Sequence, residues 1–109
     1  MRRILTDENF QTEVLDNAGP VVVEVGADWC GTCHIMDPVL EKVAIRYRGR
    51  LKVGKLDLEE NWDVTARYGV REIPTFLFFR RGELVGRIVG AVSRQELEAQ
   101  LVAKLLDGY

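Results

Sequence analysis

Residues 21–33 have the sequence VVVEVGADWCGTC, an apolar run that leads directly into two closely spaced cysteines. Four valines interrupted only by Glu24 are typical of a β-strand that is covered on both faces. We therefore expect a central strand over residues 21–25. A helix that begins near Cys30 is expected to follow, so the cysteines lie at a junction between a strand and a helix.

Helical spacing of apolar residues predicts four helices along the chain. The first follows Asp7, which we expect to cap it, and the second runs from Cys30 to about Arg48. Asn61 is expected to cap a short third helix. Ser93, with a glutamate three residues later, is expected to cap the last one.

Apolar runs over residues 51–58, 75–79 and 84–89 predict three further strands. The connection between the last two is short enough for a hairpin, which makes them antiparallel. Alternating helices and strands followed by a hairpin predict an α/β fold of three layers, in which a central mixed sheet carries helices on both faces.

Length and composition indicate one globular domain over residues 1–109. The chain has 47% hydrophobic and 29% charged residues, which is ordinary for such a domain. Fifteen basic and seventeen acidic residues give a net charge of -2, so we expect no nucleic-acid partner. Uncharged runs such as residues 73–79 are much shorter than the roughly 18 apolar residues of a membrane helix, so we expect no membrane partner either.

The expected location is the cytoplasm, because the amino-terminal segment reaches Asp7 before an apolar signal region can form. Cys30 and Cys33 are too close in sequence to connect distant segments. In a reducing compartment such a pair is more often catalytic or metal-binding than structural.

The predicted position of Cys30 at the start of a helix favours redox chemistry. Free N–H groups and the helix dipole stabilise an anion there, so the pKa of the Cys30 thiol should be lowered. The thiolate is the nucleophile of disulfide exchange. Cys33, almost one helical turn later, is close enough to attack a mixed disulfide formed by Cys30 and release the substrate.

Three other interpretations of the cysteine pair exist. A structural zinc site needs four ligands, whereas this chain has two cysteines and one histidine, His34. Residues 30–34 also match the Cys-x-x-Cys-His pattern of haem attachment, which requires a haem-sized cavity and usually a distal ligand. Finally, both cysteines could be inert small hydrophobic residues, although the neighbouring Asp28 and Trp29 make this a poor explanation.

The segment from Trp29 to Cys33, followed by Pro38, closely resembles the active site of the thioredoxin family. The resemblance covers residues 4–106. Other similar segments are residues 21–25, 55–57, 68–76 with Ile73-Pro74, and 89–91 with Gly90.

This resemblance implies a protein-disulfide oxidoreductase that maintains cell redox homeostasis. Cys30 would attack a substrate disulfide and Cys33 would resolve the product. Glu24, where the family usually has aspartate, and Lys55 would assist proton transfer from Cys33. The substrate-binding residues implied by the resemblance are Trp29, Gly31, Thr32, Ile73, Pro74 in a cis peptide, and Gly90.

The resemblance further implies disulfide-containing protein substrates, a thioredoxin reductase as the recycling partner, and a monomer. No metal and no bound cofactor are expected beyond the redox-active disulfide. Two rival functions remain at this stage. One is a more oxidising disulfide isomerase or oxidase, and the other is a non-catalytic interaction subunit with the same fold.

Four residues besides Glu24 depart from the pattern of the family. Thr32 replaces a usual proline and restores a backbone N–H for the Cys30 thiolate, so we expect a weaker reductant than a typical thioredoxin. His34 replaces a usual lysine, and when protonated it could stabilise Cys30. Asp37 adds negative charge to the same helix, and Gly26 replaces a large aromatic residue, which is expected to leave a local gap.

Overall fold

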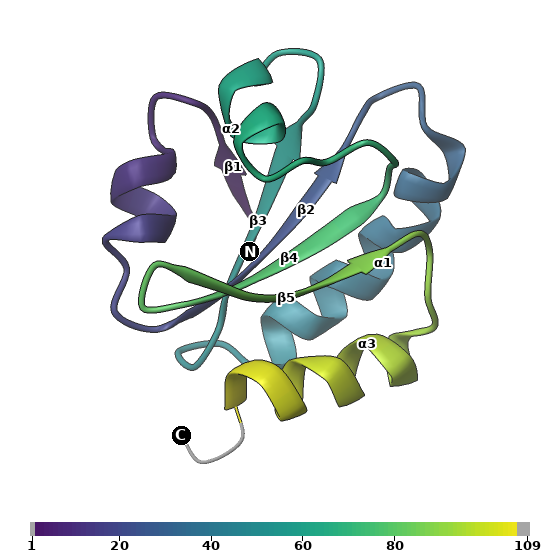
Figure 1. Ribbon diagram of the computed structural model, residues 1–109. Coiled ribbons are helices and arrows are strands. Elements are labelled where there is room, and N and C mark those ends of the chain that lie inside the picture. The colour runs from purple at the N-terminus through teal and green to yellow at the C-terminus, as the bar shows by residue number, and fades with distance from the viewer. Residues whose placement is uncertain (1, 107–109) are drawn as a thin grey trace.

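The protein has a five-stranded mixed sheet with helices on both faces, as a computed structural model of residues 2–106 shows (Figure 1). The strands lie in the order β1 (Arg3–Leu5), β3 (Lys52–Asp57), β2 (Pro20–Gly26), β4 (Thr75–Arg80) and β5 (Glu83–Val89). The first three are parallel to one another, and the β4–β5 hairpin is antiparallel. The predicted fold class is confirmed, with the valine run in the central strand.

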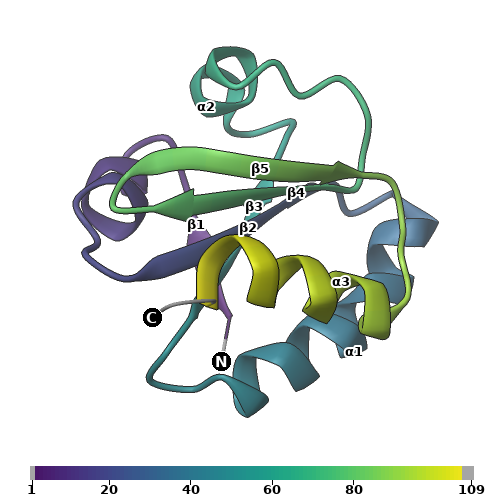
Figure 2. The same cartoon turned by 60° about the horizontal axis from the view of Figure 1, so that its bottom comes forward.

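The helices cover the sheet in two separate layers (Figure 2). On one face, α1 (Gly31–Arg46) and α3 (Arg94–Leu101), which continues into the π-helical turn η2 (Val102–Leu106), pack around one apolar core. On the other face, η1 (Gln11–Leu15) and α2 (Trp62–Arg67) pack around a second core. Within residues 2–106, none of the helices combines the length and the apolar character that a membrane-spanning segment requires.

Every residue of β2 is buried, and alternate side chains enter different cores. Val21, Val23 and Val25 belong to the core under η1 and α2, whereas Val22 belongs to the core under α1 and α3. Because side chains alternate along a strand, Glu24 shares the face of Val22. The sequence of β2 therefore places one carboxyl group between the sheet and α1.

Asp7 does not cap the helical segment that follows it, so this prediction was wrong. Its carboxylate accepts hydrogen bonds from the backbone N–H groups of Asp63, at 3.2 Å, and Val64, at 3.0 Å. Asn61 is the N-cap residue of α2, as predicted, but its side chain accepts a bond from Asp7 N at 2.9 Å instead of capping the helix. The free N–H groups of α2 favour the charged carboxylate over a neutral amide.

Strand β1 was not predicted, because three residues are too few for an alternating pattern. It forms through pairing with β3, in which Leu5 lies opposite Leu56. A Cβ atom on Gly54 would overlap the Leu5 side chain. The missing side chain of Gly54 therefore leaves the space in which Leu5 packs.

The last helix begins as predicted, since Ser93 Oγ accepts a hydrogen bond from Glu96 N at 3.1 Å. The hairpin turn before it contains Arg81 and Gly82, both with positive φ angles, of 51° and 78°. Such a turn matches the right-handed twist of the two strands. The hairpin and α3 together position Gly90, which lies in the connection between them.

Candidate active site

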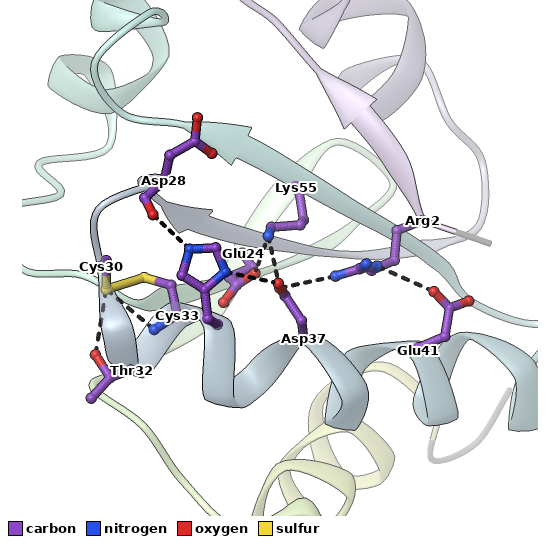
Figure 3. A network of polar contacts seen from close by, with 10 residues as sticks. Arg2, Glu24, Asp28, Cys30, Thr32, Cys33, Asp37, Glu41 and Lys55 are labelled. Atoms are coloured by element: carbon purple, nitrogen blue, oxygen red, sulfur yellow. Dashed lines mark hydrogen bonds and ion pairs between the residues drawn. A yellow bond between two sulfur atoms is a disulfide. The ribbon is translucent and has the colours of Figure 1, made fainter.

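The two cysteines form a disulfide at the amino terminus of α1, at the predicted junction with the strand (Figure 3). Cys30 is the N-cap residue, and its Cα atom lies 5.3 Å from that of Cys33. The Cys30 sulfur accepts a hydrogen bond from Cys33 N at 3.2 Å and lies 3.4 Å from the Thr32 hydroxyl oxygen. Thr32 therefore reaches Cys30 through its side chain, whereas the sequence had suggested its backbone N–H.

The two sulfur-bearing residues differ in accessibility. Cys30 is 6% exposed and Cys33 is 1% exposed, so an incoming thiol or disulfide reaches Cys30 more easily. Gly31 and Thr32 lie exposed between them. Trp29, just before the pair, is 66% exposed and is thus a surface residue.

The Ile73–Pro74 peptide bond is cis, as the family resemblance implied. Ile73 packs against the small apolar cluster that contains both cysteines. Gly90, with a φ angle of 95°, donates a hydrogen bond from its backbone N–H to the Pro74 carbonyl oxygen at 2.8 Å. Two segments distant in sequence from the cysteines therefore form one surface region with them.

Gly26 fits closely against Cys33. A Cβ atom at position 26 would lie 3.0 Å from the Cys33 sulfur and 3.4 Å from its Cβ atom. The gap expected from the loss of an aromatic residue is therefore absent at this contact, and that prediction was wrong. The first turn of α1 approaches the strand directly because Gly26 has no side chain.

Glu24 is fully buried, which excludes the alternative of a solvent-facing acid at a strand edge. Glu24 precedes Gly26 by two residues, so both lie on the same face of β2, about 7 Å apart along the strand. Because Gly26 contacts Cys33, Glu24 lies on the side of the sheet that faces Cys33. Neither carboxylate oxygen has a hydrogen-bond partner among the described residues. Burial raises the pKa of Glu24 to about 7, although the nearby Lys55 charge lowers it.

Lys55 is the residue paired with Glu24 in the register of β2 and β3, so the two predicted proton-transfer residues do meet. Its Nζ atom lies 3.8 Å from Glu24 Oε1, but only 2.7 Å from Asp37 Oδ1, to which it donates a hydrogen bond. Asp37 also accepts a bond from Arg2 at 3.0 Å, and Arg2 in turn pairs with Glu41 (Figure 3).

Asp37 thus contacts Lys55 and Arg2 in the charged network beside Glu24, and the sequence analysis did not predict these contacts. Burial raises the pKa of Asp37, but the Lys55 hydrogen bond and the charges of Lys55 and Arg2 outweigh burial and lower the pKa. The sequence did contain a signal, because Asp37 follows Cys33 by four residues and therefore lies on the same face of the helix.

His34 is engaged away from the Cys30 sulfur. Its Nε2 atom lies 2.6 Å from the Asp28 carbonyl oxygen, and its Nδ1 atom lies 3.5 Å from Asp37 Oδ2. The contacts of the His34 ring are therefore with Asp28 and Asp37, and the expected stabilisation of Cys30 by a protonated His34 is not seen as a direct contact. Within residues 2–106, no group of three or more histidine, cysteine or acidic side chains is arranged to hold a metal ion.

A disulfide between closely spaced cysteines at a helix amino terminus, beside a cis-proline, defines a class of dithiol–disulfide oxidoreductases. A family model described as Thioredoxin matches residues 2–103. The chain is 46% identical over 101 residues to a thioredoxin of Pseudomonas aeruginosa, a match that covers 93% of this chain and 94% of that protein. The chain belongs to the thioredoxin family.

Two further relatives agree with this result. A thioredoxin of Allochromatium vinosum is 44% identical over 97 residues, and Thioredoxin 1 of Nostoc sp. is 42% identical over 97 residues. Each match covers 89% of this chain and 91% of the relative. The protein is a protein-disulfide reductase that acts through its redox-active cysteine pair.

Proposed function

We propose that Cys30 is the nucleophile and Cys33 the resolving cysteine. In the dithiol form, the Cys30 thiolate attacks one sulfur of a substrate disulfide, and the other substrate sulfur leaves as a thiolate that takes up a proton. Cys33, as a thiolate, then attacks the Cys30 sulfur and displaces the second substrate thiolate, which also takes up a proton. Two electrons pass to the substrate, and the protein keeps the disulfide. The greater exposure of Cys30 carries this assignment.

Glu24 is the proposed proton acceptor for the Cys33 thiol, with Lys55 as its charged neighbour. Its burial on the α1 face of β2 and its pKa of about 7 support this role. A base whose pKa lies near the working pH exchanges protons most effectively. After resolution, the proton returns to solvent when Glu24 ionises again.

The proposed substrate-binding surface surrounds the disulfide. An extended substrate segment would lie along the backbone of Ile73 before Pro74, beside the exposed Trp29. The hydrogen bond between Gly90 and Pro74 and the packing of Ile73 on the cysteine cluster support this placement. The exposed Gly31 and Thr32 would complete the surface.

The proposed partners are disulfide-containing proteins and a thioredoxin reductase that returns the protein to its dithiol form. We further infer that residues 1–109 form one domain and that the protein is a cytoplasmic monomer, which needs neither a metal nor a bound cofactor. The family and its redox-active disulfide support these inferences.

Trapping of a mixed disulfide tests the assignment of the two cysteines. The Cys33→Ser protein should accumulate a stable mixed disulfide with insulin through Cys30, whereas Cys30→Ser should form none through this position and should lose turnover. Full turnover by Cys30→Ser would contradict the catalytic assignment of Cys30. A stable mixed disulfide between Cys33 of the Cys30→Ser protein and insulin would mean that Cys33 is the nucleophile and Cys30 the resolving cysteine.

A more oxidising role as an isomerase or oxidase is the second candidate, because the Thr32 hydroxyl lies next to the Cys30 sulfur. The equilibrium potential of the cysteine pair separates the two candidates. A value between about -250 and -290 mV supports the reductase, and a value above about -200 mV supports the oxidising role.

A further inference from the structure

Two carboxylates compete for the ammonium group of Lys55. The strand register makes Glu24 its direct neighbour, yet Lys55 Nζ lies 3.8 Å from Glu24 Oε1 and 2.7 Å from Asp37 Oδ1. Only the contact with Asp37 is a hydrogen bond. A charge-assisted hydrogen bond is the stronger interaction, so Asp37 determines where the ammonium lies.

Asp37 is itself fixed from the other side. Arg2 donates a hydrogen bond to Asp37 Oδ1 at 3.0 Å, and the Arg2 guanidinium also pairs with Glu41 at 3.4 Å (Figure 3). The Asp37 side chain is one-quarter exposed, whereas Glu24 is fully buried. Asp37 therefore stays ionised and keeps its position between two cations.

Three basic side chains and one carboxylate act on the Glu24 carboxyl group. Lys55 faces it from β3, Asp37 and His34 act on it from α1, and Arg2 acts on it from the segment before β1. From β4, the residue paired with Glu24 is the apolar Phe76. Among the described residues, these are the charged groups with the largest influence on the Glu24 carboxyl group. Asp37 weakens the support for an ionised Glu24 in two ways, because it withdraws the ammonium and adds a negative charge.

We propose that Asp37 is a positioning residue for the proton-transfer step, because it holds the Lys55 ammonium away from Glu24 and so leaves the Glu24 carboxylate without a hydrogen bond that would weaken it as a base. This inference rests on the proposed role of Glu24 as the proton acceptor for Cys33. In resolution, the Cys33 thiol gives its proton to the ionised Glu24, and the resulting thiolate attacks Cys30. With the ammonium fully on Glu24, the carboxylate would be a weaker base and this transfer would be slower.

The first test is a titration of the Glu24 carboxyl carbon by NMR in the oxidised protein, in which the cysteines do not titrate. Asp37→Asn should lower the titration midpoint by about 1 pH unit. Glu41→Gln is the matched control, because it removes the same charge from the same helix and also loses a contact with Arg2. An unchanged midpoint in Asp37→Asn, or an equal shift in Glu41→Gln, would overturn the proposal.

A second comparison separates the positioning of Lys55 from the bare charge of Asp37. The same titration is made in Lys55→Gln and in the double variant Asp37→Asn/Lys55→Gln. If Asp37 acts by holding the ammonium, its substitution shifts the Glu24 midpoint much less when Lys55 is absent. Equal shifts in both backgrounds would mean that only the charge of Asp37 matters, and they would overturn the positioning role.

The pH profile of the resolving step connects the titration with function. A mixed disulfide is formed on Cys30, and its decay is followed in a single turnover between about pH 5 and pH 9. The inflection due to Glu24 should disappear in Glu24→Gln and move to lower pH in Asp37→Asn. If it disappears in Glu24→Gln but does not move in Asp37→Asn, the proposal for Asp37 fails while the role of Glu24 stands. An unchanged profile in Glu24→Gln would overturn the role of Glu24, and with it the role of Asp37 in proton transfer.

Discussion

Gly26 and Cys33 are in such close contact that a Cβ atom on Gly26 would lie 3.0 Å from the Cys33 sulfur. Gly26 ends β2, and Cys33 lies in the first turn of α1, so strand and helix meet at the sulfur itself. In the disulfide, the sulfur is held by its bond to Cys30. In the dithiol, it can move by rotation about χ1. A side chain at position 26 should therefore disfavour the disulfide more than the dithiol.

The first prediction follows for Gly26→Ala. Overpacking of about 1 kcal/mol that acts mainly on the disulfide form would raise the redox potential by roughly 20 mV. The potential is measured by equilibration in defined thiol buffers, followed by alkylation and mass determination. Gly31→Ala is the control, since a Cβ atom there would meet nothing within 4 Å. A lower potential for Gly26→Ala, or an equal rise for Gly31→Ala, would contradict the explanation.

The buried Glu24 should make stability depend on pH. The pKa of the Glu24 carboxyl group is about 7 in the folded protein, compared with 4.5 for an unperturbed glutamate, the value that applies to the unfolded chain. Between these values the folded protein holds a proton that the unfolded chain has released, so the free energy of unfolding falls as the pH rises. The total loss through this window is at most about 3 kcal/mol.

The second prediction is that the free energy of unfolding of Glu24→Gln does not show this decrease as the pH rises. Urea denaturation of the oxidised proteins at about pH 4.5 and about pH 8 should show a stability gain for the variant that grows by as much as about 3 kcal/mol toward higher pH. Comparison with the unsubstituted protein cancels the titration of other groups. A constant difference at both pH values would mean that Glu24 does not titrate in this window.

The sequence predicted those parts of the fold and site that depend on local patterns. The valine run predicted the central strand, and the spacing of Cys30 and Cys33 predicted two sulfurs at the start of a helix. The family resemblance supplied the cis-proline at position 74.

The missed features all depend on segments that meet only in the folded chain. Asp7 caps α2 across more than fifty residues, and Asp37 reaches Lys55 from a helix on one face of the sheet. A local pattern cannot say which of two carboxylates lies nearer to a lysine. Likewise, the replacement of an aromatic residue by Gly26 suggested empty space, because the sequence does not show how closely α1 approaches.

The third prediction concerns the cap of α2. Asp7→Ala removes the acceptor of two backbone N–H groups at the start of this helix, so the free energy of unfolding should fall by about 1–2 kcal/mol. Asp7→Asn is the matched control, because its amide oxygen can still accept one of these bonds and should preserve part of the stability. Urea denaturation gives the values, and hydrogen exchange at Asp63 and Val64 localises the effect. Equal stability of Asp7→Ala and the unsubstituted protein would contradict the capping role.

The fourth prediction concerns Thr32, whose hydroxyl oxygen lies 3.4 Å from the Cys30 sulfur. A hydroxyl donates a stronger hydrogen bond to a thiolate than to a neutral disulfide sulfur, so this contact should favour the reduced form. Thr32→Val keeps the shape of the side chain but loses the donor. Removal of about 1 kcal/mol of stabilisation from the thiolate should make the potential more negative by roughly 20 mV.

Thr32→Ser retains the hydroxyl and should keep the potential of the unsubstituted protein, which we expect to lie above about -270 mV, the value of a typical thioredoxin. The same thiol-buffer equilibration measures all three proteins, and the rate of alkylation of Cys30 against pH reports the thiolate directly. If Thr32→Val and Thr32→Ser have the same potential, the hydroxyl does not act on the sulfur. If the unsubstituted protein lies at or below about -270 mV, the contact of Thr32 with Cys30 does not make this protein a weaker reductant.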